Sequence, residues 1–208
     1  MSNRNIKAQQ MRLRLAQEAA QILLQNGSRD YYAAKHKAAL HLGAADTRNM
    51  PSNTEIESAL QEYQRIFRAD VQPVELRRLR KAALQAMRFF SDFRPRLVGS
   101  VLRGTADEHS VVTLHVVASA VEDLNLFLLQ SQIPFEMGEK RVRFQAELMQ
   151  SLPVYRFVAD DVPIEMVIFP EDGPRQPPLS PLDSKPMQRA DIRALEKLLQ
   201  EDLSSPEL

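Results

Sequence analysis

A short stretch of the sequence has the residue types that can hold a phosphate group. Leu97 and Val98 are apolar and predict a strand, and Gly99-Ser100 after them predicts a tight turn. Glycine lets a backbone approach a phosphate closely, and the amides that follow it point outward toward an anion. Gly104 comes soon after, so two of the six glycines in the chain lie here. The stretch is therefore a candidate phosphate-binding turn.

An alternating pattern after the turn predicts a half-buried strand. Its apolar set is expected to face the core and consists of Val112, Leu114 and Val116. The intervening set lies on the other face and consists of Val111, Thr113 and His115. The turn and this second face together form a candidate binding site.

His115 has several roles open to it on that face. Its imidazole can act as a base, bind a metal or contact a nucleotide, and it can equally serve the packing of the sheet. His109 precedes it in a predicted turn, but no third ligand accompanies the two histidines in the sequence. The sequence therefore leaves the metal-ligating residues unknown.

Glu165 is an acidic residue inside a later apolar strand, between Ile164 and Met166. Burying a carboxylate without a partner is costly. Glu165 is therefore expected either to face a solvated site or to pair with a cation such as Arg103. It is the candidate catalytic residue.

The order of these features resembles the nucleotidyltransferase superfamily of the DNA polymerase β type, over residues 94–170. In that superfamily a Gly-Ser turn is followed by a strand with the motif Asp-x-Asp, and a later strand supplies a third carboxylate. Gly99-Ser100 resembles the turn, and Glu165 in the strand 163–167 resembles the third carboxylate. The resemblance implies a small mixed sheet, a nucleoside triphosphate and Mg²⁺ as cofactors, and transfer of a nucleotidyl group. It also implies the candidate cofactor-binding residues, which are Gly99, Ser100, Arg103, Gly104, Ser110, Thr113 and His115.

The sequence departs from the superfamily where two metal-binding aspartates are expected, because Val111 and Thr113 occupy those positions. Mg²⁺ requires oxygen ligands in octahedral geometry. Valine supplies none, threonine supplies a neutral one, and Glu165 alone does not replace three carboxylates. We therefore expect a degenerate member that binds a nucleotide or another phosphorylated ligand without efficient catalysis.

The alternative is an active nucleotidyltransferase with an atypical metal site. Its carboxylates would come from Glu165 and from acidic residues in predicted turns, namely Asp107, Glu108, Asp160 and Asp161. The other interpretation of these four acids is that they are solvated turn residues.

A basic run on a predicted helix supports a third hypothesis. Arg77, Arg78, Arg80 and Lys81 lie on one helix, and such a stripe can follow the phosphates of RNA or DNA. The other interpretation is a solvated face, or a face docked against the acidic half of the chain. Residues 1–103 hold 18 Lys and Arg against 9 Asp and Glu, and the remaining residues hold 9 against 18.

The elements that must position these residues predict an α+β protein, with an N-terminal helical region followed by a small mixed β-sheet. Apolar residues at helical spacing predict four helices before Pro95. The second is expected to begin near Ser28, and a capping box, Ser52 to Glu55, begins the third. Later elements are a helix at 121–130, strands at 141–146, 154–158 and 164–169, and a last helix from Ile192.

These elements predict four segments along the chain. They are a helical domain (1–92), a nucleotidyltransferase-like α/β core (93–170), a Pro-rich extended segment (171–188), and a C-terminal helix with its tail (189–208). The Pro-rich segment is expected on the surface or strapped over it.

The composition bears on where in the cell the protein is expected. The 208 residues include no cysteine, which excludes disulfides and Cys-zinc sites. No apolar run approaches the ~20 residues that a membrane-spanning helix needs, and the N-terminus shows no secretory signal. We therefore expect a cytoplasmic protein without a membrane partner, whose oligomeric state does not follow from the sequence.

Overall fold

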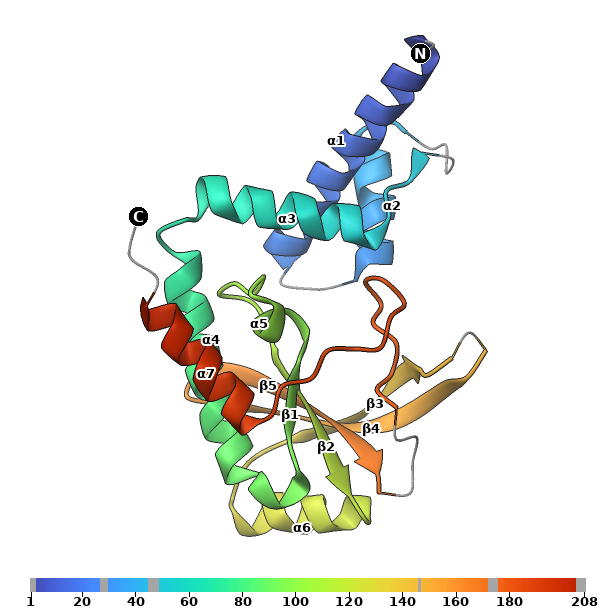
Figure 1. The fold of residues 1–208 in the computed structure, drawn as a ribbon. Coiled ribbons are helices and arrows are strands. Elements are labelled where there is room, and N and C mark those ends of the chain that lie inside the picture. The colour runs from blue at the N-terminus through green and yellow to red at the C-terminus, as the bar shows by residue number, and fades with distance from the viewer. Residues whose placement is uncertain (1–2, 27–29, 45–48, 146, 172–175, 205–208) are drawn as a thin grey trace. The chain divides into compact units, whose positions relative to one another are not determined.

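The computed structural model describes residues 3–26, 30–44, 49–145, 147–171 and 176–204 of the chain. It confirms the predicted α+β class, because helices come first and a five-stranded mixed sheet follows within the described residues (Figure 1). Two compact units are present. Unit 1 comprises residues 1–72, 107–109 and 181–183, and unit 2 comprises residues 73–106, 110–180 and 184–208. The finer division into four segments stays a prediction.

Unit 1 is built, in its described residues, from three helices: α1 (Asn3–Asn26), α2 (Tyr31–His41) and α3 (Asn53–Phe67). Their buried side chains form one core, which includes Leu15, Leu23, Tyr31, Ile56 and Leu60. Asp30 caps α2, because its side chain accepts a hydrogen bond from the Ala33 amide at 3.0 Å. The start that was expected near Ser28 lies outside the described residues.

The predicted capping box is present at the start of α3. The Glu55 amide donates to the Ser52 hydroxyl at 3.2 Å, and the Ser52 amide donates to a Glu55 oxygen at 2.6 Å. Arg12 of α1 binds the same carboxylate through hydrogen bonds of 2.6 and 2.7 Å. Hydrogen bonds from Arg12, and then from Ser52, lower the pKa of Glu55 to about 2. Glu55 therefore links the start of α3 to α1.

Unit 2 contains the sheet and the helices that pack on it. The helices are α4 (Gln72–Phe89), the 3₁₀ helix η2 (Ser91–Phe93), α5 (Gly99–Arg103), α6 (Val121–Gln130) and α7 (Ile192–Ser204). The strands are β1 (Arg96–Val98), β2 (Val112–Ala118), β3 (Glu136–Arg143), β4 (Met149–Ala159) and β5 (Val162–Pro170). The sheet has the order β1-β2-β5-β4-β3, in which β2 and β5 are parallel and the other neighbouring pairs are antiparallel.

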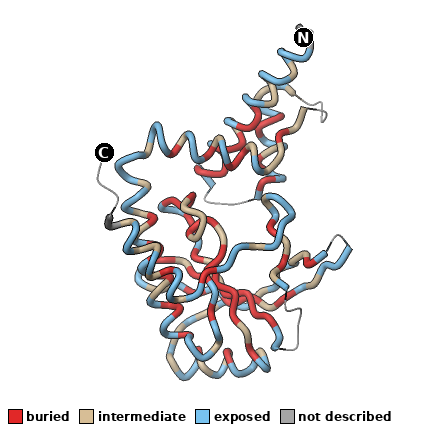
Figure 2. Tube along the Cα trace, viewed as in Figure 1, coloured by how far each residue is buried: buried red, intermediate tan, exposed pale blue. Residues whose placement is uncertain are grey.

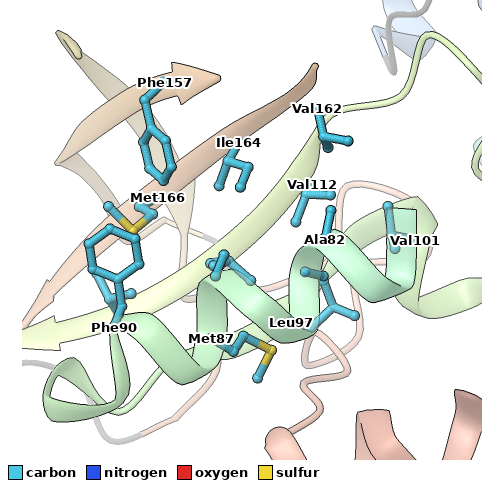
Figure 3. Close-up of a cluster of buried hydrophobic side chains, with 14 of the residues drawn as sticks. Ala82, Met87, Phe90, Leu97, Val101, Val112, Phe157, Val162, Ile164 and Met166 are labelled. Carbon is cyan, nitrogen blue, oxygen red and sulfur yellow. The ribbon is translucent and has the colours of Figure 1, made fainter. Parts of the chain in front are cut away.

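One face of the sheet carries the main core of unit 2. Val112, Leu114 and Val116 of β2 are fully buried, as predicted. Figure 3 shows Phe90, which follows α4, beside Met166 of β5. Buried residues accordingly concentrate along the central strands in Figure 2. We call this side the helix face, and we call the opposite side, which carries Thr113, His115 and Glu165, the site face.

The strand predicted at 141–146 is confirmed only in part, because it overlaps the observed strand over residues 141–143 alone. The strand observed there is β3, which ends at Arg143, and residue 146 lies outside the described residues. β3 is the edge strand next to β4 and carries mostly exposed and half-exposed charged side chains. Charged edge strands prevent unwanted pairing, and they give no apolar alternation for a sequence pattern to detect. β4 extends well beyond the predicted 154–158, because the whole of β3 pairs with it.

The described part of the predicted Pro-rich segment forms a turn that is tied to the sheet. Leu179 bridges to Pro186, and the Leu179 amide donates to the Arg143 carbonyl at 2.5 Å, at the end of β3. Farther along, Ala190 and Leu97 of β1 exchange backbone hydrogen bonds of 2.8 and 3.0 Å. After β5, the chain therefore passes the end of β3 at Leu179 and reaches β1 at Ala190.

Ion pairs join α4 to α7, which lie side by side in Figure 1. Arg80 is 6% exposed, and its Nη1 donates to both oxygens of Asp202 at 2.7 and 2.8 Å. The same guanidinium also donates to two backbone carbonyls of α5 at 3.2 and 3.3 Å. Arg88 binds Glu196 at 2.7 Å. The basic and acidic halves of the sequence thus attract each other within unit 2.

Replacing Arg80 by alanine is expected to lower the free energy of unfolding by about 3 kcal/mol, because Asp202 and two carbonyls lose their buried partner. The measurement is urea unfolding followed by circular dichroism. The matched control is Arg78→Ala, which removes a partly exposed ion pair with Glu75 on the same helix. That control should lose no more than about 0.5 kcal/mol, and equal losses in the two variants would contradict the role of Arg80.

The Arg12–Glu55 pair predicts a pH dependence of stability. The folded-state pKa of Glu55 lies below the ordinary value of 4.5, so its stabilisation is complete above pH 4.5 and is lost as the pH falls toward 2. Glu55→Gln removes this titration. The difference in free energy of unfolding between the wild type and the variant, measured with urea, should therefore shrink over that range. A constant difference would contradict the ion pair.

Candidate functional site

Gly99 lies at the junction of β1 and α5, against the strand that follows. Its φ of +80° falls in the left-handed region that favours glycine. A Cβ on Gly99 would lie 3.9 Å from both Cβ and Oγ1 of Thr113. Val98 is the register partner of Thr113 in the β1–β2 pair. The predicted phosphate-binding turn therefore lies next to Thr113.

The parallel pairing of β2 and β5 places Thr113 directly opposite Glu165. The structure thus brings together Gly99, Thr113 and Glu165, which the sequence analysis assigned to one site. Val111 comes just before β2 and is 38% exposed. Neither Val111 nor Thr113 offers a carboxylate, so Glu165 is the acidic member of this group.

Glu165 is held by two cations from neighbouring strands. Lys140 of β3 donates to Oε1, and Arg156 of β4 donates from Nε to Oε2 at 3.1 Å. The side chain of Glu165 is 12% exposed, whereas those of Lys140 and Arg156 are 43% and 46% exposed. Glu165 was expected either to face a solvated site or to pair with a cation such as Arg103. The structure shows an ion pair, but the cations are Lys140 and Arg156.

His115 is buried on the site face, at 4% exposure. Its ring packs on Phe169 with centroids 4.6 Å apart, and its Nδ1 has no hydrogen-bond partner among the described residues. Burial, and then the charges of Arg189 and Lys140, lower the pKa of His115 to about 3. At neutral pH the imidazole is therefore neutral and a weak base, which fits a packing role better than general base catalysis.

The remaining candidate residues lie on or after α5. Ser100 and Ser110 are buried, at 7% and 4% exposure. Gly104 ends α5 with a φ of +84°, and a Cβ there would lie 3.7 Å from Nη2 of Arg80. Arg103 precedes it and is half-buried. Gly104 is therefore placed beside α4, at the other end of α5 from the Gly99 turn.

The four acids from predicted turns are engaged elsewhere or lie in a turn. Asp107 is buried and accepts a hydrogen bond at 3.1 Å from the backbone amide two residues later. Glu108 binds Arg68 at 2.6 Å within unit 1. Asp160 and Asp161 form the turn between β4 and β5, with φ of 49° and 60°. In the described part of the chain, no group of three or more His, Cys, Asp or Glu residues could hold a metal ion.

The basic run on α4 binds acceptors within unit 2. Arg80 is bound to Asp202, and Arg77 donates to the backbone carbonyl of the same residue. Arg78 binds a glutamate on its own helix, and Lys81 is exposed. These contacts favour a helix docked against the acidic half of the chain. Nucleic-acid binding by this run stays a prediction.

The sequence analysis missed Lys140 and Arg156, the cations that bind Glu165. A signal for Arg156 was present, because a two-residue hairpin turn at 160–161 places Arg156 and Glu165 at equal distances from the turn. Lys140 lies two strands away from β5, and no local pattern aligns it with Glu165.

Unit 1 also carries a groove of about 860 Å³ along α1 and α3. Its lining includes the exposed apolar side chains of Leu13, Ile66 and Phe67. The groove contains none of the residues that the sequence assigned to a site, and nothing in the structure shows what covers it.

Comparison with known proteins gives no match, since no family model, no curated protein and no solved structure matches this chain. Among the described helices, none has both the length and the apolar character that crossing a membrane requires.

His115 is expected to stay neutral in the folded protein well below pH 6.5, its ordinary pKa. Between pH 6.5 and about 3 the unfolded chain takes up a proton that the folded chain does not, so stability falls as the pH drops through that window. His115→Phe should flatten this part of the profile, measured by urea unfolding. NMR follows the imidazole directly, and a His115 signal titrating near 6.5 in the folded protein would contradict the buried, unpaired environment.

Proposed function

We propose that this chain is a degenerate nucleotidyltransferase-like protein, which binds a nucleotide or another phosphorylated ligand without efficient catalysis. The observation that carries the proposal is the proximity of Gly99, Thr113 and Glu165 on one side of the sheet. It is the arrangement that the resemblance to the DNA polymerase β type superfamily implies for the phosphate-binding turn, the metal-binding strand and the third acidic strand. The cytoplasmic location expected from the sequence belongs to the same proposal.

The side chains of this group support binding over transfer. In the superfamily, Mg²⁺ holds the triphosphate and activates the attacking hydroxyl. Val111 and Thr113 offer no carboxylate for a metal, and the Glu165 carboxylate is already bound by Lys140 and Arg156. A divalent cation at Glu165 would meet two positive side chains that repel it.

The alternative, an active nucleotidyltransferase with an atypical metal site, has less support. It requires further oxygen ligands for the metal, and two of the four turn acids have other partners, since Asp107 accepts a backbone hydrogen bond and Glu108 binds Arg68. This alternative makes a distinct prediction. A radiolabelled nucleoside triphosphate should label a protein or RNA acceptor, and Glu165→Gln should abolish that transfer.

Gly99→Ala is expected to weaken ATP binding about tenfold or more, measured by titration calorimetry, because a left-handed φ costs an L-residue about 1–2 kcal/mol and the turn should relax away from Thr113. The wild type should release heat with ATP and should transfer no label.

Gly43→Ala is the matched control for that variant. Gly43 also has a positive φ, +60°, but it lies in unit 1 with nothing within 4 Å of an added Cβ. It should share the backbone strain and leave ATP binding unchanged. Absence of heat with any nucleoside triphosphate, or wild-type affinity in Gly99→Ala, would contradict the proposal. Transfer of label that depends on Glu165 would favour the alternative.

A further inference from the structure

Two cations form the outer layer over the Glu165 carboxylate. Glu165 is the buried member of the group, at 12% exposure, while Lys140 and Arg156 are more than three times as exposed. An ammonium and a guanidinium each carry several N–H donors, and the contacts with Glu165 use one nitrogen of each. Both cations can therefore bind a second anion on the site face while they keep Glu165.

Gly138 of β3 provides the space for the Arg156 guanidinium. A Cβ on Gly138 would lie 2.8 Å from Nη1 of Arg156, which is closer than non-bonded atoms approach. The backbone does not require glycine there, because Gly138 is not among the glycines with positive φ. A side chain at position 138 would make the Arg156 guanidinium shift, so the glycine leaves room for the position that the guanidinium occupies.

Two more arginines bring positive charge to the same face. Arg96 of β1 is the register partner of His115. Besides burial, the charges of Arg189 and Lys140 lower the pKa of His115, and burial together with Arg96 lowers the pKa of Arg189. Arg96 has Asp191 at 3.4 Å, whereas Arg189 has no carboxylate partner among the described residues. Arg189 therefore adds positive charge near His115, whereas the charge of Arg96 is offset by Asp191.

We propose that Lys140 and Arg156 bind the phosphate chain of the ligand directly, in the place of a divalent cation. This inference rests on the proposed function and specifies its ligand as a free diphosphate or triphosphate chain, alone or on a nucleoside. Ammonium and guanidinium groups form strong, charge-assisted hydrogen bonds with phosphate oxygens. Mg²⁺ neutralises part of the negative charge on the phosphate chain, so it should weaken binding of that chain to the protein.

The test is titration calorimetry with ATP and with inorganic tripolyphosphate, each in EDTA and in excess Mg²⁺. Both probes should bind in EDTA and bind more weakly with Mg²⁺. Lys140→Gln and Arg156→Gln should each weaken binding about tenfold, the loss expected for one charge-assisted contact. Equal affinities for the two probes would show that only the phosphate chain is recognised. Tighter binding of ATP would show an additional contact with the nucleoside.

Glu165→Gln separates this inference from a metal site, because the two predict opposite signs. Removing the carboxylate frees both cations, so tripolyphosphate in EDTA should bind about three- to tenfold more tightly. A metal ligand at this position would instead give a loss of binding. Glu136→Gln is the matched control, since it removes the same charge from an exposed residue opposite Arg156 in the β3–β4 register. Its effect should be clearly smaller.

Gly138→Ala tests the geometry with every charge retained. The added methyl group makes the flexible end of the Arg156 side chain shift, so this variant should weaken binding measurably, but less than Arg156→Gln does. Circular dichroism first checks that each variant is folded. If Lys140→Gln is not folded, Gly138→Ala is used in its place. Binding that requires Mg²⁺, or that is unchanged in these variants, overturns the inference and leaves the proposed function standing. No binding of either probe in either buffer overturns both.

Discussion

The parallel pairing of β2 with β5 is the interaction on which the rest of unit 2 depends. It places Val112 opposite Ile164 on the helix face and, one residue along, Thr113 opposite Glu165 on the site face. A slip of one residue would send the buried apolar set to the site face and the polar pair into the core. The hydrophobic packing of the helices therefore fixes the register of polar residues that take no part in that packing. In this way the core positions the site.

The environment of Glu165 then decides which kind of ligand the site face favours. A carboxylate within an apolar strand needs a partner, and here β3 and β4 supply two. Their positive groups neutralise the oxygen atoms that a hard metal ion would use and leave N–H donors outermost. Under the proposed function, this arrangement favours an anionic ligand over a metal ion.

The helix face and the capping box at Ser52 were predictable because they depend on local periodicity and local hydrogen bonds. The α+β class followed from the helical spacing of apolar residues before Pro95 and from the alternating pattern of the strand after the Gly99-Ser100 turn. β3 was misplaced, since an edge strand with charged side chains has no apolar signal. The partners of Glu165 and of Arg80 were out of reach for another reason, because each depends on where a distant strand or helix is placed. The resemblance to nucleotidyltransferases stays a prediction.

The order of the strands also has a consequence for how the chain folds. β4 and β5 meet across a two-residue turn, and β3 precedes them directly, whereas β2 is separated from β5 by α6, β3 and β4. Closing a long loop costs more entropy than closing a short one, so we expect the β3–β4–β5 meander to form early and the insertion of β2 to be the slow step. Until that step, the apolar edge of β5 is open to pairing with other chains, and nascent molecules are vulnerable to aggregation.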